Sequence, residues 1–271
     1  MSQLYIGTSG YDYPEWAGVF YPDNLKRKDY LAYYADVFNA VELNGTFYRM
    51  PTSRQMMSLA NRSGDRLRFS VKANRLLTHE IPANWKDEAQ SFIEAVKPLH
   101  DRGLLGNILF QLPQSFHRTP DNRLYLAELL KVFGDYPLAV EFRHKEWIRY
   151  SVFEGLAERN ASFVFCDMPR LPSLPSLLYD NSITERVQHS AGMERMYLRL
   201  HGRNSDAWYA GDSSSNGSQR YDYQYTEDEL ALFASEIRII AGHSKSVDVF
   251  FNNHPRGYGV QNAIRLKEFL S

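Results

Sequence analysis

Short runs of apolar, β-branched and aromatic residues alternate with longer stretches of helical periodicity along almost the whole chain. The short runs predict strands and the longer stretches predict helices, because side chains repeat every two residues along a strand and about every 3.6 residues along a helix. The predicted strands cover residues 5–7, 40–43, 68–72, 108–111, 138–142, 163–166, 197–201 and 247–251. The predicted helices cover residues 30–38, 53–61, 86–99, 124–133, 152–159, 227–240 and 260–270.

Eight such alternations favour a closed (β/α)8 barrel of the TIM type over a doubly wound sheet, because right-handed crossovers between parallel strands can close a ring. The length of 271 residues agrees with this, and no linker interrupts the pattern, so we expect a single barrel domain over residues 1–271. Long loops are predicted after the sixth and seventh strands, at 168–193 and 202–225. They are either functional mouth loops or tolerated insertions.

The charge balance and the cysteine content exclude several kinds of ligand contact and structural site. The 31 Lys and Arg nearly cancel the 32 Asp and Glu, so no global positive field would attract nucleic acid or anionic lipid, and any such contact must be local. The single cysteine, Cys166, excludes an internal disulfide and a cysteine-based structural zinc site. No apolar run reaches membrane-spanning length, so we expect a cytoplasmic protein without membrane contact. The sequence indicates no protein partner.

The carboxyl ends of the predicted strands are unusually polar, and in a barrel these ends converge on one mouth. Because strand side chains alternate, Glu42 shares a face with Asn44, and Glu141 shares one with Arg143. These pairs are expected to point inward, as a functional site or as a structural salt-bridge network that fills the barrel. The full set is Glu42, Asn44, Lys72, Gln111, Glu141, Arg143, Asp167, Arg199, His201, Asn252, Asn253 and His254.

Aromatic and basic residues accompany these strand ends in the predicted mouth loops. Tyr48 and Arg49 follow the second strand, His79 follows the third, and Trp208 and Tyr209 follow the seventh. Aromatic platforms next to arginine suit sugar rings, nucleobases or single-stranded nucleic acid. Each aromatic residue could instead be a packing anchor.

Metal ligation is the other chemistry that these residue types allow. His79, His201 and His254 with Glu42, Glu141 and Asp167 offer nitrogen and oxygen ligands for zinc or manganese. However, no His-Glu-x-x-His or other local metal motif is present, and nearby lysine and arginine would compete for the carboxylates. We therefore expect no tightly held structural metal and no cofactor, with a divalent metal at the mouth as the remaining alternative.

The strand-end segments are similar to those of a known family. The stretches that carry the resemblance are Ile6-Gly7-Thr8-Ser9-Gly10, Val41-Glu42-Leu43-Asn44, Val71-Lys72-Ala73, Gln111-Leu112-Pro113, Val140-Glu141-Phe142-Arg143, Leu198-Arg199-Leu200-His201-Gly202 and Phe251-Asn252-Asn253-His254. In order along nearly the whole chain, they resemble the DUF72 family, also called YecE-like, although Tyr11 and Gly45 stand where tryptophan and serine are commoner. The resemblance implies a TIM-like barrel and assigns no reaction. A looser likeness of that barrel to endonuclease IV and sugar isomerases suggests nucleic-acid or phosphate binding, by analogy.

The residues themselves favour an enzyme that acts on a phosphorylated or sugar-containing substrate, a nucleotide or nucleic acid among them, as a hydrolase or an isomerase. In this hypothesis Lys72, Arg143 and Arg199 hold an anion, Glu42 or Glu141 is the general base, and His201 or His254 is the general acid. The remaining polar and aromatic mouth residues contact the substrate. The alternatives are a non-catalytic protein that binds single-stranded nucleic acid and a metal-dependent phosphoesterase or isomerase.

Overall fold

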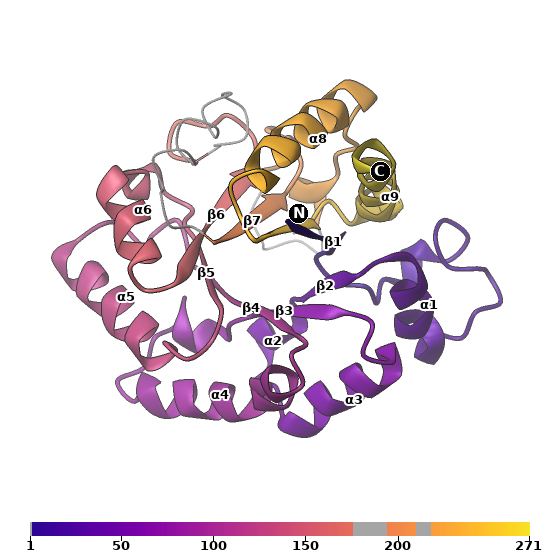
Figure 1. The fold of residues 1–271 in the computed structure, drawn as a ribbon. Helices are drawn as coiled ribbons and strands as arrows, with labels where there is room; N and C mark the ends of the chain where they lie inside the picture. Colours follow the sequence, from indigo (N-terminus) through magenta and orange to yellow (C-terminus); the bar gives the residue numbers. More distant parts are fainter. Residues whose placement is uncertain (1, 176–193, 210–217) are drawn as a thin grey trace.

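The computed structural model describes residues 2–175, 194–209 and 218–271, and in them eight parallel strands form one nearly closed ring (Figure 1). The order around the sheet is β1-β8-β7-β6-β5-β4-β3-β2, so neighbours in the chain are neighbours in space. The predicted barrel is confirmed. The strands are β1 (Gln3–Thr8), β2 (Ala40–Leu43), β3 (Arg68–Lys72), β4 (Leu105–Gln111), β5 (Leu138–Glu141), β6 (Ala161–Asp167), β7 (Arg195–Leu200) and β8 (Ser246–Phe251).

Helices surround the strands on the outside of the ring, as Figure 1 shows. They are α1 (Tyr30–Val37), α3 (Ser53–Ser63), α4 (Trp85–Asp101), α5 (Pro120–Val132), α6 (Tyr150–Ala157), α8 (Glu227–Ala241) and α9 (Tyr258–Leu270), and the short α2 (Gly45–Tyr48) lies at the carboxyl end of the strands. Short 3-10 turns are η1 (Pro14–Trp16), η2 (Arg27–Asp29), η3 (Arg75–Leu77), η4 (Lys145–Trp147), η5 (Gln219–Tyr221) and η6 (Pro255–Gly257). In the described residues, no helix combines the length and the apolar character that crossing a membrane requires.

Side-chain hydrogen bonds complete the ring where β1 meets β2. The Asn39 amide makes two hydrogen bonds to the backbone of β1, at 2.8 and 2.9 Å. The Tyr34 hydroxyl accepts from the Thr8 amide at 2.8 Å and donates to the Ala40 carbonyl at 3.1 Å. Gly7 lies so close that a Cβ there would be 2.0 Å from the Ala40 carbonyl oxygen. The contact between β1 and β2 therefore requires a residue without a side chain at position 7.

Alternation along each strand divides the core into two layers. Outward-facing residues such as Phe69 and Val71 pack beneath the helices. Inward-facing residues such as Leu109, Val164 and Phe250 fill the barrel interior. Burial on both faces explains why the strands have continuous apolar runs rather than a polar–apolar alternation. It also means that only the last inward residue of each strand can reach the mouth.

A second buried polar layer lies at the amino end of the barrel, and the sequence analysis did not single it out. Asp248 is fully buried, accepts a hydrogen bond from the Asn107 amide at 3.2 Å, and lies 3.7 Å from Arg68 Nε. Burial raises the pKa of Asp248 to about 6, because the cation and the amide offset only part of the desolvation. The charge of this layer therefore changes in the mildly acidic range.

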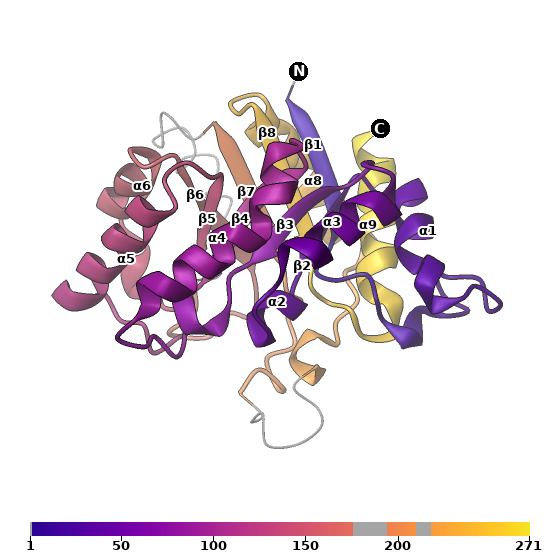
Figure 2. The ribbon, with the colours of Figure 1, turned by 90° about the horizontal axis from the view of Figure 1, so that it is seen from below.

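The long loops lie at the carboxyl end of the barrel. The predicted loop 168–193 is described up to residue 175 and the predicted loop 202–225 at 202–209 and 218–225, and the rest of both lies outside the described residues. Leu174 and Trp208 join the inner apolar cluster at this end. Figure 2 shows that the described residues after β7 extend beyond the carboxyl edge of the strands, on the same side as α2. These segments partly cover the mouth.

Candidate active site at the carboxyl mouth of the barrel

The carboxyl end of the ring is a layer of polar side chains. Each of these side chains belongs to the last inward-facing residue of its strand, or to the residue that directly follows the strand. The layer is formed by Glu42, Lys72, Gln111, Glu141, Cys166, Arg199 and Asn252, and Arg143 and His201 stand one step further out. The structure thus brings together most of the strand-end residues that the sequence indicated.

Arg199 lies at the centre of this layer and bridges two carboxylates. Its guanidinium donates to Glu42 Oε1 at 2.6 Å and to Glu141 Oε2, and all three side chains are buried. Glu42 also accepts from the Ser9 hydroxyl at 2.6 Å and from the Tyr197 hydroxyl at 2.7 Å. Both oxygens of Glu42 are therefore occupied, by three donors that come from the end of β1 and from β7.

Glu141 is held as an anion by a second cation. Arg143 Nε donates to Glu141 Oε1, and His201 Nε2 lies 3.4 Å from the same oxygen. Burial alone would raise the pKa of Glu141, but Arg143 and Arg199 hold it well below its usual range. Glu141 is consequently ionised throughout the physiological pH range.

His201 is buried and neutral. Burial and the neighbouring Arg143 lower the pKa of His201 to about 3. The Asn252 side-chain nitrogen lies 3.0 Å from His201 Nδ1, and His201 Nε2 lies 3.4 Å from both a terminal nitrogen of Arg143 and Glu141 Oε1. His201 therefore contributes a neutral ring to the layer and no charge of its own.

Lys72 differs from the other charged members of the layer, because it is not paired directly with an acid. In the described part of the chain its amine makes no hydrogen bond or ion pair, and Nζ lies 4.2 Å from the centre of the Phe47 ring. Burial lowers the pKa of Lys72 to about 7 together with the Arg199 and Arg143 cations, and the charges of Glu141 and Glu42 offset only part of this shift. A substantial fraction of the amine is therefore unprotonated at neutral pH.

A cavity of about 200 Å³ opens above this layer. Gln111 and Arg143 line it from the strands and His79 from the loop after β3, and Trp208, Tyr209 and Tyr221 from the loop after β7 complete the wall. Burial and the Lys72 cation lower the pKa of His79 to about 4, so its imidazole is neutral. Gln114 and Arg220 also line it, so the cavity presents two guanidinium groups, two amides and a neutral imidazole.

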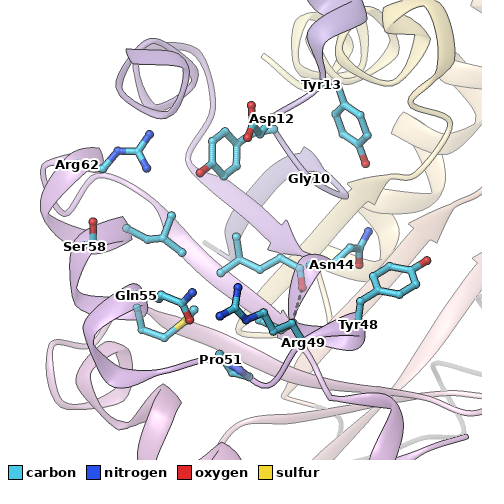
Figure 3. A pocket seen from close by; sticks show the side chains of 16 residues that line it. Gly10, Asp12, Tyr13, Asn44, Tyr48, Arg49, Pro51, Gln55, Ser58 and Arg62 are labelled. Carbon is cyan, nitrogen blue, oxygen red and sulfur yellow. Dashed lines mark hydrogen bonds between the residues drawn. The ribbon is translucent and has the colours of Figure 1, made fainter. Parts of the chain in front are cut away.

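A larger pocket of about 630 Å³ lies beside the mouth, between the loop after β1 and helices α2 and α3 (Figure 3). Asn44, Tyr48 and Arg49 of the predicted set line it, together with Tyr13. Tyr48 is 74% exposed, and Asn44 Oδ1 is buried without a hydrogen-bond partner. His254 stacks on Tyr13 with ring centres 4.5 Å apart, so it forms the rim between pocket and mouth. These residues lie around the polar layer rather than in it.

Asp167 and Asn253 lie outside the mouth, contrary to the expectation that all strand-end polar groups converge there. Because Cys166 faces inward, alternation turns Asp167 toward the helices, where it pairs with Arg203 at 2.8 Å and accepts from the Tyr225 hydroxyl at 2.6 Å. Asn253 points outward in the same way and donates to the Tyr223 carbonyl at 2.8 Å. Both side chains attach loops to the barrel wall.

Sequence reasoning missed two residues that donate hydrogen bonds to Glu42 of the polar layer, Tyr197 and Ser9. Tyr197 precedes Arg199 by two residues, so the strand period already placed both on one face. Ser9 belongs to the Gly7-Thr8-Ser9-Gly10 segment that follows the first predicted strand, and its hydroxyl donates to Glu42. In both cases the partner comes from a strand that is distant in sequence.

Two groups of potential metal ligands occur in the described residues. Glu141, Cys166 and His201 lie within reach of one ion, but Arg143 and Arg199 occupy the Glu141 carboxylate and burial raises the pKa of the Cys166 thiol well above its usual range. A metal would need the thiolate and a free carboxylate, so this set does not suit one. His117, His144 and Glu146 form the other group, on the loops after β4 and β5.

A family model described as "Protein of unknown function DUF72" matches residues 5–271. The chain belongs to the DUF72 family. This DUF72 protein is 28% identical to the UPF0759 protein YunF of Bacillus subtilis (strain 168) over 284 aligned residues, which cover 98% of this chain and 94% of YunF. The resemblance seen in the strand-end motifs is confirmed.

Solved structures of DUF72 proteins have the same barrel. The protein from Thermotoga maritima MSB8 is 33% identical with a TM-score of 0.85 and coverage of 99% of both chains. One from Enterococcus faecalis V583 is 22% identical with a TM-score of 0.83, covering 99% of this chain and 95% of that one. The catalytic domain of a mannanase from Streptomyces sp. SirexAA-E is 12% identical with a TM-score of 0.51, covering 93% and 75%, which shows the fold alone.

Proposed function

We propose that this DUF72 protein is an enzyme that binds a small phosphorylated or sugar-containing substrate at the barrel mouth and transfers a proton with Lys72. The observation that carries the proposal is the Lys72 amine itself, which makes no hydrogen bond or ion pair in the described residues and has a pKa of about 7, because burial and two arginines outweigh the nearby Glu141 and Glu42 charges. A general base works best when its pKa is close to the working pH. Structural lysines rarely meet this condition, because ion pairing raises their pKa.

The two buried glutamates are less suited to proton transfer than the sequence alone suggested. Glu42 accepts hydrogen bonds on both oxygens, and the pKa of Glu141 is held well below its usual range by Arg143 and Arg199, although burial opposes this. A glycosidase mechanism needs one carboxyl that is protonated at working pH, which Glu141 does not supply. In this proposal the role of base passes to Lys72, and Glu42 and Glu141 hold the arginines in place.

Arg143 is the group best placed to bind the anionic part of a substrate. Its Nε faces Glu141 and one terminal nitrogen lies 3.4 Å from His201, while the other terminal nitrogen makes no hydrogen bond in the described residues. Arg143 also lines the 200 Å³ cavity together with Gln111 and His79. Guanidinium groups bind phosphate and carboxylate oxygens through such charge-assisted hydrogen bonds.

Turnover assays with a panel of sugar phosphates, other phosphate esters, glycosides and nucleic acids, with and without divalent metal, test the proposal. The active substrate is expected to give a rate that rises with pH through about 7, since the base form of Lys72 is required. Lys72→Met should abolish this activity, and Lys97→Met should not change it, because Lys97 is an exposed residue of α4 that pairs with Asp101. Activity that is equal in Lys72→Met and in the unchanged protein would refute the role of Lys72.

Exposed aromatic residues favour one alternative, a non-catalytic protein that binds single-stranded nucleic acid. Tyr48 is 74% and Tyr209 is 56% exposed at the mouth, and exposed rings can stack on successive bases. This function predicts that Tyr48→Ala and Arg49→Ala weaken oligonucleotide binding more than Lys72→Met does. Oligonucleotide binding without turnover of any panel compound would favour it.

A further inference from the structure

We propose that the pocket of about 630 Å³ beside the mouth is a second binding site, which takes a small aromatic compound that carries an acidic group such as a carboxylate, sulfonate or phosphate. This inference goes beyond the proposed function, because it assigns a ligand class to a pocket that the residues of the polar layer do not line. It does not depend on whether the mouth catalyses a reaction.

The pocket has the size and the lining of a site for an organic molecule. Its volume of about 630 Å³ falls within the range of roughly 300–1,000 Å³ that is usual for small-molecule sites. The buried residues Leu43, Pro51 and Met56 line it, together with the half-buried Leu59. An inorganic ion would leave this apolar surface in contact with water, whereas the body of an organic ligand covers it.

Two tyrosines of the lining favour a ligand with a flat ring. Tyr13 is fixed in place, because its ring stacks on His254 and its hydroxyl donates to the Ser9 carbonyl at 2.6 Å. Tyr48 lines the pocket and is nevertheless 74% exposed, so most of its ring surface is available for stacking. An aromatic ligand can use both surfaces, one as a fixed wall and the other as a stacking partner.

The charge of the pocket favours an anion. Its acidic residue, Asp12, is already neutralised by Arg27 at 2.6 Å. The Arg49 guanidinium makes no hydrogen bond or ion pair in the described part of the chain, and Arg62 donates to the Lys28 carbonyl at 2.8 Å without a carboxylate partner there. Figure 3 shows both guanidinium groups turned toward the pocket. Because guanidinium binds carboxylate, sulfonate and phosphate oxygens strongly, Arg49 is the anchor for the acidic group of the ligand.

The Asn44 carboxamide gives the pocket a polar group that the fold does not use. Asn44 directly precedes α2, at the position where asparagine often caps a helix, yet its side chain makes no capping hydrogen bond. Its Oδ1 is buried without a hydrogen-bond partner in the described residues, and an unpaired buried acceptor costs free energy. Since Asn44 lines the pocket, a hydroxyl or amino substituent on a bound ring supplies the missing donor.

Isothermal titration calorimetry of the whole, tag-free protein at pH 7 with naphthalene-1-sulfonate tests the proposal. This probe joins a flat apolar body to an anion that a hydrolase acting on phosphate esters would not remove. Naphthalene-1-methanol offers the ring without the charge, and methanesulfonate offers the charge without the ring. We expect one molecule of naphthalene-1-sulfonate to bind per chain, with a dissociation constant at least tenfold lower than that of either other compound.

Variants locate the bound probe. Arg49→Gln should raise the dissociation constant at least tenfold, whereas Arg54→Gln, on α3 outside the lining, should change it less than twofold. Gly45→Phe narrows the pocket and should also weaken binding, and it is tolerated by the fold because a Cβ there would meet no other part of the chain within 4 Å. Arg143→Gln alters only the mouth cavity and should leave the affinity unchanged. The comparison of the three probes needs no variant, so the test survives if one of them folds poorly.

Several results would overturn the inference. They are the absence of saturable binding of naphthalene-1-sulfonate up to about 1 mM, equal affinity for naphthalene-1-methanol, and binding that is lost in Arg143→Gln but kept in Arg49→Gln. Displacement of the probe by a single-stranded oligonucleotide that binds more tightly than the probe would assign the pocket to nucleic acid instead. Unchanged binding of the probe to Lys72→Met, in which turnover is expected to be lost, would support the pocket independently of the proposed function.

Discussion

Replacement of Arg199 by methionine removes the cation that two buried carboxylates share. Arg199 donates to Glu42 at 2.6 Å and to Glu141, and its side chain is 2% exposed while both acids are 0% exposed. Loss of one partner from a buried pair costs about 3–5 kcal/mol, because the other charge stays buried and unneutralised. We expect Arg199→Met to lower the free energy of unfolding by about this amount at pH 7, a large part of the stability of an ordinary domain.

Urea unfolding at pH 7, followed by circular dichroism and tryptophan fluorescence, measures this loss. The matched control is Arg27→Met, which removes an exposed ion pair with Asp12 at 2.6 Å and is expected to leave the urea midpoint nearly unchanged. A second variant, Arg199→Met with Glu42→Gln, should recover part of the loss, because it removes one of the two buried carboxylate charges that Arg199 neutralises.

The pH dependence of the free energy of unfolding gives an independent check that the loss in Arg199→Met is electrostatic. In the unchanged protein burial alone would raise the pKa of Glu141, but the Arg143 and Arg199 cations hold it well below its usual 4.5, so this stabilisation is present above about pH 5 and is lost as the pH falls. Without Arg199 the pKa of Glu141 is less depressed, and the deficit of the variant should shrink on acidification. A loss below about 1 kcal/mol at pH 7 would refute the electrostatic account.

Three further predictions concern the ring and its metal chemistry. Burial raises the pKa of Asp248 from 3.8 to about 6, so the stabilisation of the fold by its protonated form is fully present below about pH 4 and is lost as the pH rises through 6. Between pH 4 and pH 7 the free energy of unfolding should therefore change by about 3 kcal/mol on account of Asp248, and urea titrations of Asp248→Asn should lack this change. Gly7→Ala should lower the melting temperature sharply, since its Cβ would meet the Ala40 carbonyl oxygen at 2.0 Å, and an unchanged melting temperature would contradict the tight seam. Metal analysis of tag-free protein should find no zinc whose retention depends on Glu141, and weak zinc binding in titrations should depend on His117. Zinc that is bound by the unchanged protein and lost in Glu141→Gln would contradict the conclusion that the Glu141, Cys166 and His201 group does not suit a metal.

The sequence predicted the barrel and most of its mouth because both follow from a local period. Apolar runs of strand length and helices of matching length alternate, and parallel order then places all carboxyl ends on one side. Counting in steps of two from the buried interior selects Glu42, Lys72, Glu141 and Arg199 as inward-facing. The same count turns Asp167 and Asn253 outward, and the expectation that they reach the mouth was wrong because they were chosen for polarity and not for register.

The chemistry of the mouth depends on distances that no local pattern contains. Glu42 and Arg199 are 157 residues apart in the chain and 2.6 Å apart in space, so the sequence names the charges without saying which of them neutralise one another. Lys72 was expected to hold an anion together with Arg143 and Arg199, yet only the packed ring shows that the carboxylates are bound to the arginines and the amine is not. Composition and periodicity specify which groups reach the mouth, whereas burial and the placement of cations around each group set its protonation and hence its reactivity.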